Sequence, residues 1–250
     1  MNLWTYEHFI TLVPSVILMI ICAILLRKFL INKSLNIRMI PFQILAVILF
    51  ISEIIKQVVS ISRGYDLYHI PLHVCSLFIF LIPLMAFYKG KYQDVVKSLA
   101  CSVCLALTIF MTIIPSLIYS DGNIRNFFND YFDFHTVFFH ELVIFEFILI
   151  LALNLHPNTN MKHLKYMLVF SVFYTVIAAT MSQILSTNYS NFYSSNIPPV
   201  ANLVESIKNS VGYFWGQTLY VIVLGLLHIG FFVFMCYLYN LINRCKNKIR

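Results

Sequence analysis

The chain has 250 residues, of which 60% are hydrophobic and only 11% are charged, and its formal net charge at pH 7 is +7. A soluble domain of this length cannot bury so large an apolar fraction in one core. The positive charge is distributed over short loops rather than gathered on one face, so it indicates membrane topology and argues against a nucleic-acid partner.

Seven stretches are long and apolar enough to cross a bilayer, which takes about 20 residues for a hydrocarbon core of roughly 30 Å. Polar breaks separate them, and only the connection from about Ser186 to Tyr213 is long. The sequence therefore predicts an all-α polytopic membrane protein, a seven-transmembrane-helix bundle that forms a single integral membrane domain over residues 1–250. The predicted spans are about residues 9–26, 39–60, 70–88, 96–117, 134–155, 164–185 and 214–241.

Loop charge predicts the orientation of this bundle. Lys and Arg favour the cytoplasmic side of a membrane, so we expect the N-terminus outside and the C-terminus in the cytoplasm. Basic residues follow the first apolar stretch, which predicts an uncleaved anchor rather than a signal peptide. The expected location is the cell membrane, and an Asn, Ile, Lys, Phe and Tyr bias points to a bacterial one. Thirteen of the 17 basic residues fall on the predicted inner side: Arg27, Lys28, Lys33, Arg38, Lys89, Lys91, Lys97, Lys162, Lys165, Arg244, Lys246, Lys248 and Arg250.

Polar residues inside spans are costly, so each one is a functional candidate. The predicted orientation places groups from five segments in the outer half of the bundle, with His140 roughly 9–10 Å deep at 1.5 Å per residue. The inner half is poorer in such groups. This asymmetry predicts a polar cavity that opens outward, and the candidate substrate-binding residues are Glu53, Glu141, Gln183, Asn188 and Tyr189.

The string His69-Ile70-Pro71-Leu72-His73-Val74-Cys75-Ser76 contains the candidate nucleophile. Pro71 suits the first turn of a helix, which would place Cys75 near the positive end of a helix dipole. A thiolate with a nearby imidazole is the minimum for nucleophilic acyl transfer. His73 and Cys75 would point in nearly opposite directions on a helix, so His140 is the better partner. The alternative is that Cys75 only packs, as an isolated cysteine in an apolar helix commonly does.

Other spacings carry weaker predictions. His69 and His73 have the i, i+4 spacing of helical metal ligands and could form a three-histidine site with His140, although nothing in the sequence enforces it. Cys101 and Cys104 have redox-motif spacing in an apolar span, which favours packing. No nucleotide loop, zinc-protease helix or dinucleotide fingerprint is present, so we expect no cofactor and assign no metal.

The segment Pro71-Leu72-His73-Val74-Cys75-Ser76 resembles the Pro-Leu-His-Leu-Cys-Ser signature of the bacterial YwaF integral membrane proteins. Pro115, Phe138-Phe139-His140 and Asn188-Tyr189 follow in the order of that family. The family is similar to the eukaryotic transmembrane protein 164 acyltransferases, which handle ether phospholipids. The resemblance implies Cys75 as nucleophile and His140 as base, with His73 nearby. The chain departs from the family in having no glycines just before Asn188.

The leading hypothesis is a lipid acyltransferase with a membrane phospholipid as its substrate. The main alternative is a proton- or cation-coupled transporter or substrate-binding permease component that uses Glu53, Glu141, Glu146 and His140. The sequence has no inverted repeat and no matching broken helices, which argues against it. A receptor or structural scaffold is the third hypothesis, because seven spans with an outside N-terminus also describe receptors.

Overall fold

The computed structural model describes residues 4–158 and 160–248, and all regular elements within these ranges are helices. Six of them are long and apolar enough to cross a membrane by length and composition. The predicted all-helical membrane protein is therefore confirmed. The six helices are α1 (Tyr6–Leu30), α2 (Leu35–Ser62), α4 (Gln93–Ile113), α6 (Tyr131–Ala152), α7 (His163–Ile184) and α9 (Tyr213–Lys248).

The third predicted span, residues 70–88, begins later than the sequence predicts. Helix α3 covers Leu77–Phe87, and a 3-10 turn at Val74–Ser76 precedes it. Ile70 has ψ 131° and His73 has ψ 155°, so the backbone around Pro71 is extended. A proline disfavours helical geometry in the residue before it, which explains the extended backbone at position 70. Pro71 thus lies before the helix, not in its first turn, and α3 is shorter than the roughly 20 residues of an ordinary span.

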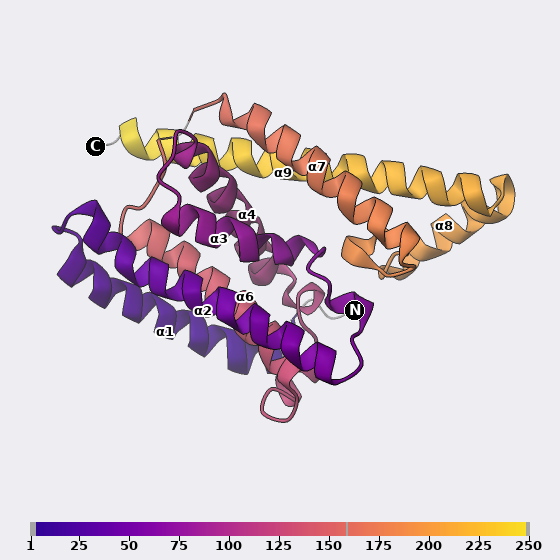
Figure 1. Ribbon diagram of the computed structural model, residues 1–250, viewed down its shortest axis with the longest axis horizontal. Helices are drawn as coiled ribbons and strands as arrows, with labels where there is room; N and C mark the ends of the chain where they lie inside the picture. The colour runs from indigo at the N-terminus through magenta and orange to yellow at the C-terminus, as the bar shows by residue number, and fades with distance from the viewer. Residues whose placement is uncertain (1–3, 159, 249–250) are drawn as a thin grey trace.

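The long helices form two groups that α3 and α4 connect (Figure 1). Helix α6 packs against both α1 and α2, and α7 packs against α9 on the other side of the molecule. Helix α3 contacts α2 and α4, and α4 contacts α6, α7 and α9. The segment that leads into α3 therefore lies where α2, α6 and α7 can all supply side chains.

The start of α6 is tied to the end of α2 by a polar contact. The Asp130 carboxylate accepts hydrogen bonds from the backbone N–H of Phe132 at 2.8 Å and of Asp133 at 3.4 Å, and so caps α6. The Arg63 guanidinium donates to the same carboxylate at 2.6 Å. This guanidinium, together with the two backbone donors, holds the pKa of Asp130 below its ordinary value. The pair fixes the end of the bundle at which α2 ends and α6 begins.

A short amphipathic helix, α8 (Pro198–Val211), joins α7 to α9. Gly212, with φ 87°, makes the turn between α8 and α9 in a backbone region that favours glycine. Gly216 lies so close to α8 that a Cβ atom there would come within 2.7 Å of the Lys208 Cα. These two glycines let α8 fold back tightly on the first turn of α9.

Candidate functional site

Two residues from the second half of the chain hold the segment that carries Cys75. The Ser190 hydroxyl accepts a hydrogen bond from the Val74 backbone N–H at 2.9 Å. The Tyr174 hydroxyl donates to the Leu72 carbonyl at 3.0 Å and lies 2.7 Å from the Ser190 hydroxyl. Ser190 itself has φ 50°, in the left-handed region that non-glycine residues seldom adopt. These contacts hold the residues just before Cys75 in an extended conformation.

Tyr189 contacts the same segment at His73 and just before it. Its side chain is fully buried, and its hydroxyl donates to the Leu67 carbonyl at 2.5 Å. The His73 ring packs edge-on against Tyr189, with 5.5 Å between centroids, and its Nε2 lies 3.2 Å from the Tyr68 carbonyl. Because a carbonyl only accepts, Nε2 of His73 carries the proton and Nδ1 has the free lone pair.

Glu53 on α2 is the centre of a buried polar network, and only 5% of it is exposed. Lys56, three residues later on the same helix, places Nζ 2.9 Å from Glu53 Oε1. Gln57 donates to the same oxygen at 2.7 Å. His135 from α6 places Nε2 at 3.4 Å from Glu53 Oε2. This Nε2 is buried and has no hydrogen-bond partner among the described residues. Glu53 thus forms an ion pair within α2 and faces an imidazole of α6.

The network also reaches the segment before α3. Gln57 Nε2 donates to the His69 carbonyl at 2.8 Å, and the Ser60 hydroxyl is hydrogen-bonded to His69 Nδ1 at 2.7 Å. The His69 ring stacks on Phe132 at the start of α6, with 4.2 Å between centroids. Helices α2 and α6 therefore fix one end of the Cys75 segment, and Tyr174 and Ser190 fix the other.

His140, the histidine that the sequence singles out as the candidate base, lies buried on α6. Its Nδ1 is 2.6 Å from the Thr136 carbonyl. Since this carbonyl accepts, Nδ1 carries the proton, and Nε2 keeps a lone pair that can take a proton from another group. His140 follows His135 by five residues, so the two lie roughly 7–8 Å apart along the helix axis at 1.5 Å per residue.

Lys56 is the common neighbour of these groups. Its ammonium is within electrostatic range of five titratable side chains from α6 and from the segment before α3. The five are His69, His73, Cys75, His135 and His140. We call Lys56, Glu53 and these five residues the Lys56 cluster. Of the candidate site residues, Cys75, His73 and His140 thus share with Glu53 an electrostatic interaction with Lys56.

Glu141 has a different environment from its neighbour His140. It is half-buried and within electrostatic range of Tyr119, the residue whose backbone carbonyl contacts His8 of α1 at 3.0 Å. Its Oε1 is buried without a hydrogen-bond partner among the described residues. The described contacts of Glu141 are thus on the α1 side of α6 rather than in the Lys56 cluster.

Gln183 and Asn188 support the loop that follows α7. Gln183 donates to the Phe192 carbonyl at 2.8 Å and accepts from Gln217 of α9 at 3.2 Å. The Asn188 side-chain oxygen accepts from the backbone N–H groups of Tyr193 and Ser194, each at 3.2 Å. Their described polar groups are engaged within this loop, so their contribution to the site is the shape of the loop that carries Tyr189 and Ser190.

The other spacings noted in the sequence do not form a metal site. Within residues 4–158 and 160–248, no group of three or more His, Cys, Asp or Glu side chains is arranged to hold a metal ion. The three-histidine arrangement of His69, His73 and His140 is therefore not formed. Cys101 and Cys104 are both buried in α4, as the packing interpretation predicts.

Three contributors to the site were not identified from the sequence: His135, Tyr174 and Ser190. His135 precedes His140 by five residues, a spacing that does not place the two on one face of a helix, so periodicity gave no signal for it. Tyr174 and Ser190 carry no signal, because each acts on a segment about 100 residues earlier in the chain.

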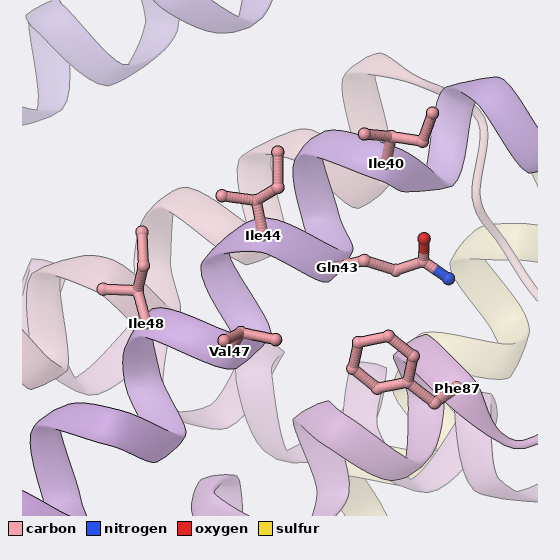
Figure 2. A pocket seen from close by; sticks show the side chains of 6 residues that line it. All are labelled: Ile40, Gln43, Ile44, Val47, Ile48 and Phe87. Atoms are coloured by element: carbon pink, nitrogen blue, oxygen red, sulfur yellow. The ribbon is translucent and has the colours of Figure 1, made fainter.

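An apolar groove of about 330 Å³ lies between the first half of α2 and the end of α3 (Figure 2). Gln43, the polar residue in its lining, donates to the Ala86 carbonyl at 3.0 Å. Its amide nitrogen is therefore occupied, and the groove offers mainly hydrocarbon to an occupant. The lining residues are Ile40, Gln43, Ile44, Val47, Ile48 and Phe87.

Comparison with known proteins identifies the family. The sequence model of the TMEM164 family matches residues 3–239, which is nearly the whole chain. No curated protein and no solved structure matches the chain. The chain belongs to the TMEM164 family.

Proposed function

We propose that this member of the TMEM164 family is a membrane acyltransferase that uses Cys75 as nucleophile and His140 as general base and acid. The observation that carries the proposal is the hydrogen bond from His140 Nδ1 to the Thr136 carbonyl at 2.6 Å. It leaves Nε2 as a proton acceptor in the same polar cluster as a free cysteine. Nucleophile, base and an orienting group are the parts that covalent acyl transfer requires.

In the first half-reaction, His140 Nε2 takes the thiol proton and the Cys75 sulfur attacks the carbonyl carbon of a lipid ester. The negative charge that develops on the carbonyl oxygen and on the leaving alkoxide is stabilised by the Lys56 ammonium. The carbon–oxygen ester bond breaks, and the alkoxide takes the proton from His140. The product is an acyl-thioester on Cys75 and a lipid with one acyl chain fewer.

The groove between α2 and α3 supports a lipid as the acyl donor. It lies on α2, the helix that carries Lys56, and reaches the end of α3, the helix that follows the Cys75 segment, and its lining is apolar (Figure 2). The lining residues of α2, from Ile40 to Ile48, cover roughly 12 Å at 1.5 Å per residue. One leaflet of a membrane offers roughly 15 Å of hydrocarbon, so an acyl chain fits the length of this groove.

The proposal includes the membrane setting. We place the chain in a bacterial cell membrane as one seven-span domain, with α3 as the short third span, the N-terminus outside and the C-terminus in the cytoplasm. This orientation is favoured by the Lys and Arg residues of the loops, because 13 of the 17 basic residues then lie on the cytoplasmic side. Tyr189 acts by positioning the Cys75 segment, and Gln183 and Asn188 by shaping the loop that holds Tyr189.

Acyl-thioester trapping tests the proposal. Purified protein in lipid is incubated with a phospholipid that is labelled in its acyl chain, and hydroxylamine-sensitive label is measured on the wild type, Cys75→Ser and Cys22→Ser. Cys22 is also free and half-buried, but it lies on α1, so it is the matched control. We expect label on the wild type and Cys22→Ser alone. Equal label on Cys75→Ser, or none on folded wild type, would contradict the proposal.

A proton-coupled transporter is the second candidate, and Glu146 favours it. This residue of α6 is fully buried, and both carboxylate oxygens have no hydrogen-bond partner within the described part of the chain. Ionisable groups in such positions often mark proton pathways. Transport by this route would be lost in Glu146→Gln and retained in Cys75→Ser, which is the reverse of what acyl transfer predicts.

A further inference from the structure

His135 lies against a buried carboxylate, although the two do not form a hydrogen bond. Its Nε2 lies 3.4 Å from Glu53 Oε2, and both residues are only 5% exposed. The partner of His140 is instead a backbone carbonyl, that of Thr136. An imidazole that faces a buried carboxylate is the arrangement that orients a histidine base in many hydrolases and transferases. The first half-reaction proposed for Cys75 and His140 does not use His135.

The carboxylate that faces His135 is held firmly in place. Glu53 accepts from Lys56 at 2.9 Å and from Gln57 at 2.7 Å, both on its own helix. Gln57 is in turn fixed by the His69 carbonyl and by the Tyr65 hydroxyl, at 2.8 and 3.0 Å. The Lys56 ammonium offsets the Glu53 charge, so the carboxylate can remain ionised in a buried position. Because Nε2 of His135 faces Glu53, Nδ1 is the nitrogen left to accept a proton from a substrate.

His135 is also nearer the polar end of the bundle than His140. It lies in the second turn of α6, which begins at Tyr131, and the Arg63–Asp130 pair marks that end of the helix. Half of the Arg63 side chain is exposed. The two imidazoles that α6 contributes to the cluster therefore lie roughly 7–8 Å apart in depth. A lipid acyl chain approaches from the apolar side, whereas a hydroxyl acceptor is polar and belongs at the polar end.

We propose that His135, oriented by Glu53, is the general base that activates the acceptor hydroxyl in the second half-reaction. This inference rests on the proposed acyl transfer through Cys75. His135 Nδ1 takes the proton of the acceptor hydroxyl, whose oxygen attacks the carbonyl carbon of the thioester. A carbon–oxygen bond forms and the carbon–sulfur bond breaks, with its electron pair passing to sulfur. The Cys75 thiolate then takes up the proton from the cluster, and no oxidation or reduction occurs. The acceptor is an alcohol, such as the free hydroxyl of a lysophospholipid.

The test separates the two half-reactions. His135→Asn is incubated with acyl-labelled phospholipid and a lysophospholipid acceptor, and both the thioester on Cys75 and the labelled product are followed in time. We expect label on Cys75 to persist in this variant while product formation falls by about 100-fold or more, the usual contribution of a general base. His163→Asn is the matched control, because His163 is equally buried but begins α7, on another face of the molecule.

Two further results keep the inference falsifiable. Exogenous imidazole should restore product formation to His135→Ala, which a merely structural role of His135 would not allow. Unchanged product formation in folded His135→Asn, with label on wild type, overturns this inference and leaves the proposed function standing. Loss of the Cys75 label itself in folded His135→Asn also overturns it, because His135 would then serve the first half-reaction. No label on folded wild type overturns the proposed function and this inference together.

Discussion

The Lys56 cluster and the surroundings of Glu146 each contain a buried glutamate, but only the carboxylate in the cluster has polar partners. In the cluster, the buried carboxylate of Glu53 has an ammonium at 2.9 Å, an amide at 2.7 Å and an imidazole at 3.4 Å. Glu146 is also buried and lies on α6, ten residues after Thr136. Both of its carboxylate oxygens have no hydrogen-bond partner among the described residues. A buried charge is stable only when it is paired and hydrogen-bonded. The comparison teaches that a buried carboxylate in a span can belong to a polar site only where neighbouring side chains pair with it, as Lys56 and Gln57 do for Glu53.

The largest difference should come from neutralising the two glutamates. Glu53→Gln leaves Lys56 buried without its partner, so the free energy of unfolding should fall by about 3 kcal/mol, the usual effect of breaking a buried pair. Glu146→Gln removes an ionisable group that has no partner, so stability should be unchanged or higher. Thermal unfolding in the same detergent measures both. Equal destabilisation of the two variants would contradict the distinction between the two regions.

Removing the hydroxyl of Tyr174 should have a smaller effect. Tyr174→Phe loses the hydrogen bonds to Leu72 and Ser190 that hold the Cys75 segment. We expect unfolding to become easier by about 1 kcal/mol, the typical net value of one hydrogen bond. The rate at which a maleimide labels Cys75 should also change. Tyr166→Phe is the control, since Tyr166 is 43% exposed on the same helix. An unchanged labelling rate would mean that Tyr174 does not hold this segment.

The groove between α2 and α3 predicts a selective effect on the donor lipid. Ile44→Trp adds a large side chain to the lining and should lower activity several-fold with long-chain donors, with less effect on short-chain donors, as a change of a few methylene contacts would produce. Ile51→Trp is the control, because Ile51 is exposed on α2 and is not a lining residue. The activity of both variants is measured with donors of increasing acyl-chain length. Equal losses at all lengths in Ile44→Trp would contradict the role of the groove in binding the acyl chain.

The smallest effect should come from the exposed pair Arg63–Asp130. Arg63→Gln should lower stability by about 0.2–1 kcal/mol, the range of surface ion pairs. The Arg63 guanidinium lowers the pKa of Asp130 in the folded protein from its ordinary value of 3.8. The pair therefore stabilises the fold above that ordinary value, and this contribution is lost as pH falls through the lower, folded pKa. Unfolding curves of the two proteins should converge at acidic pH. A difference that grows on acidification would be incompatible with this pairing.

The sequence predicted the membership of the cluster better than its geometry. Cys75, His73, His140 and Glu53 could be grouped because polar residues are rare in apolar spans and loop charge gives them a common depth. Depth does not say which face of a helix a residue occupies. For this reason Glu141 was grouped with His140, although its described contacts are on the α1 side.

The residue at which α3 begins could not be predicted from the sequence pattern. The stretch of residues 70–88 is apolar apart from a few polar side chains such as His73 and Ser76, and a proline in the first turn is common in helices. The extended backbone before Val74 is stabilised instead by Tyr174 and Ser190, which are far away in sequence. Only the folded arrangement of α7 and its following loop brings these hydroxyls to the segment, so no local pattern could have predicted the late start of the helix.

The measurement that tests the account most directly is mass spectrometry of the protein during turnover with a phospholipid donor. The account predicts one acyl adduct per chain, located on the peptide that contains Cys75, formed faster than product and removed by a hydroxyl acceptor. A chain that turns over without any adduct, or that carries its adduct on another cysteine, would contradict the assignment of Cys75 as the nucleophile.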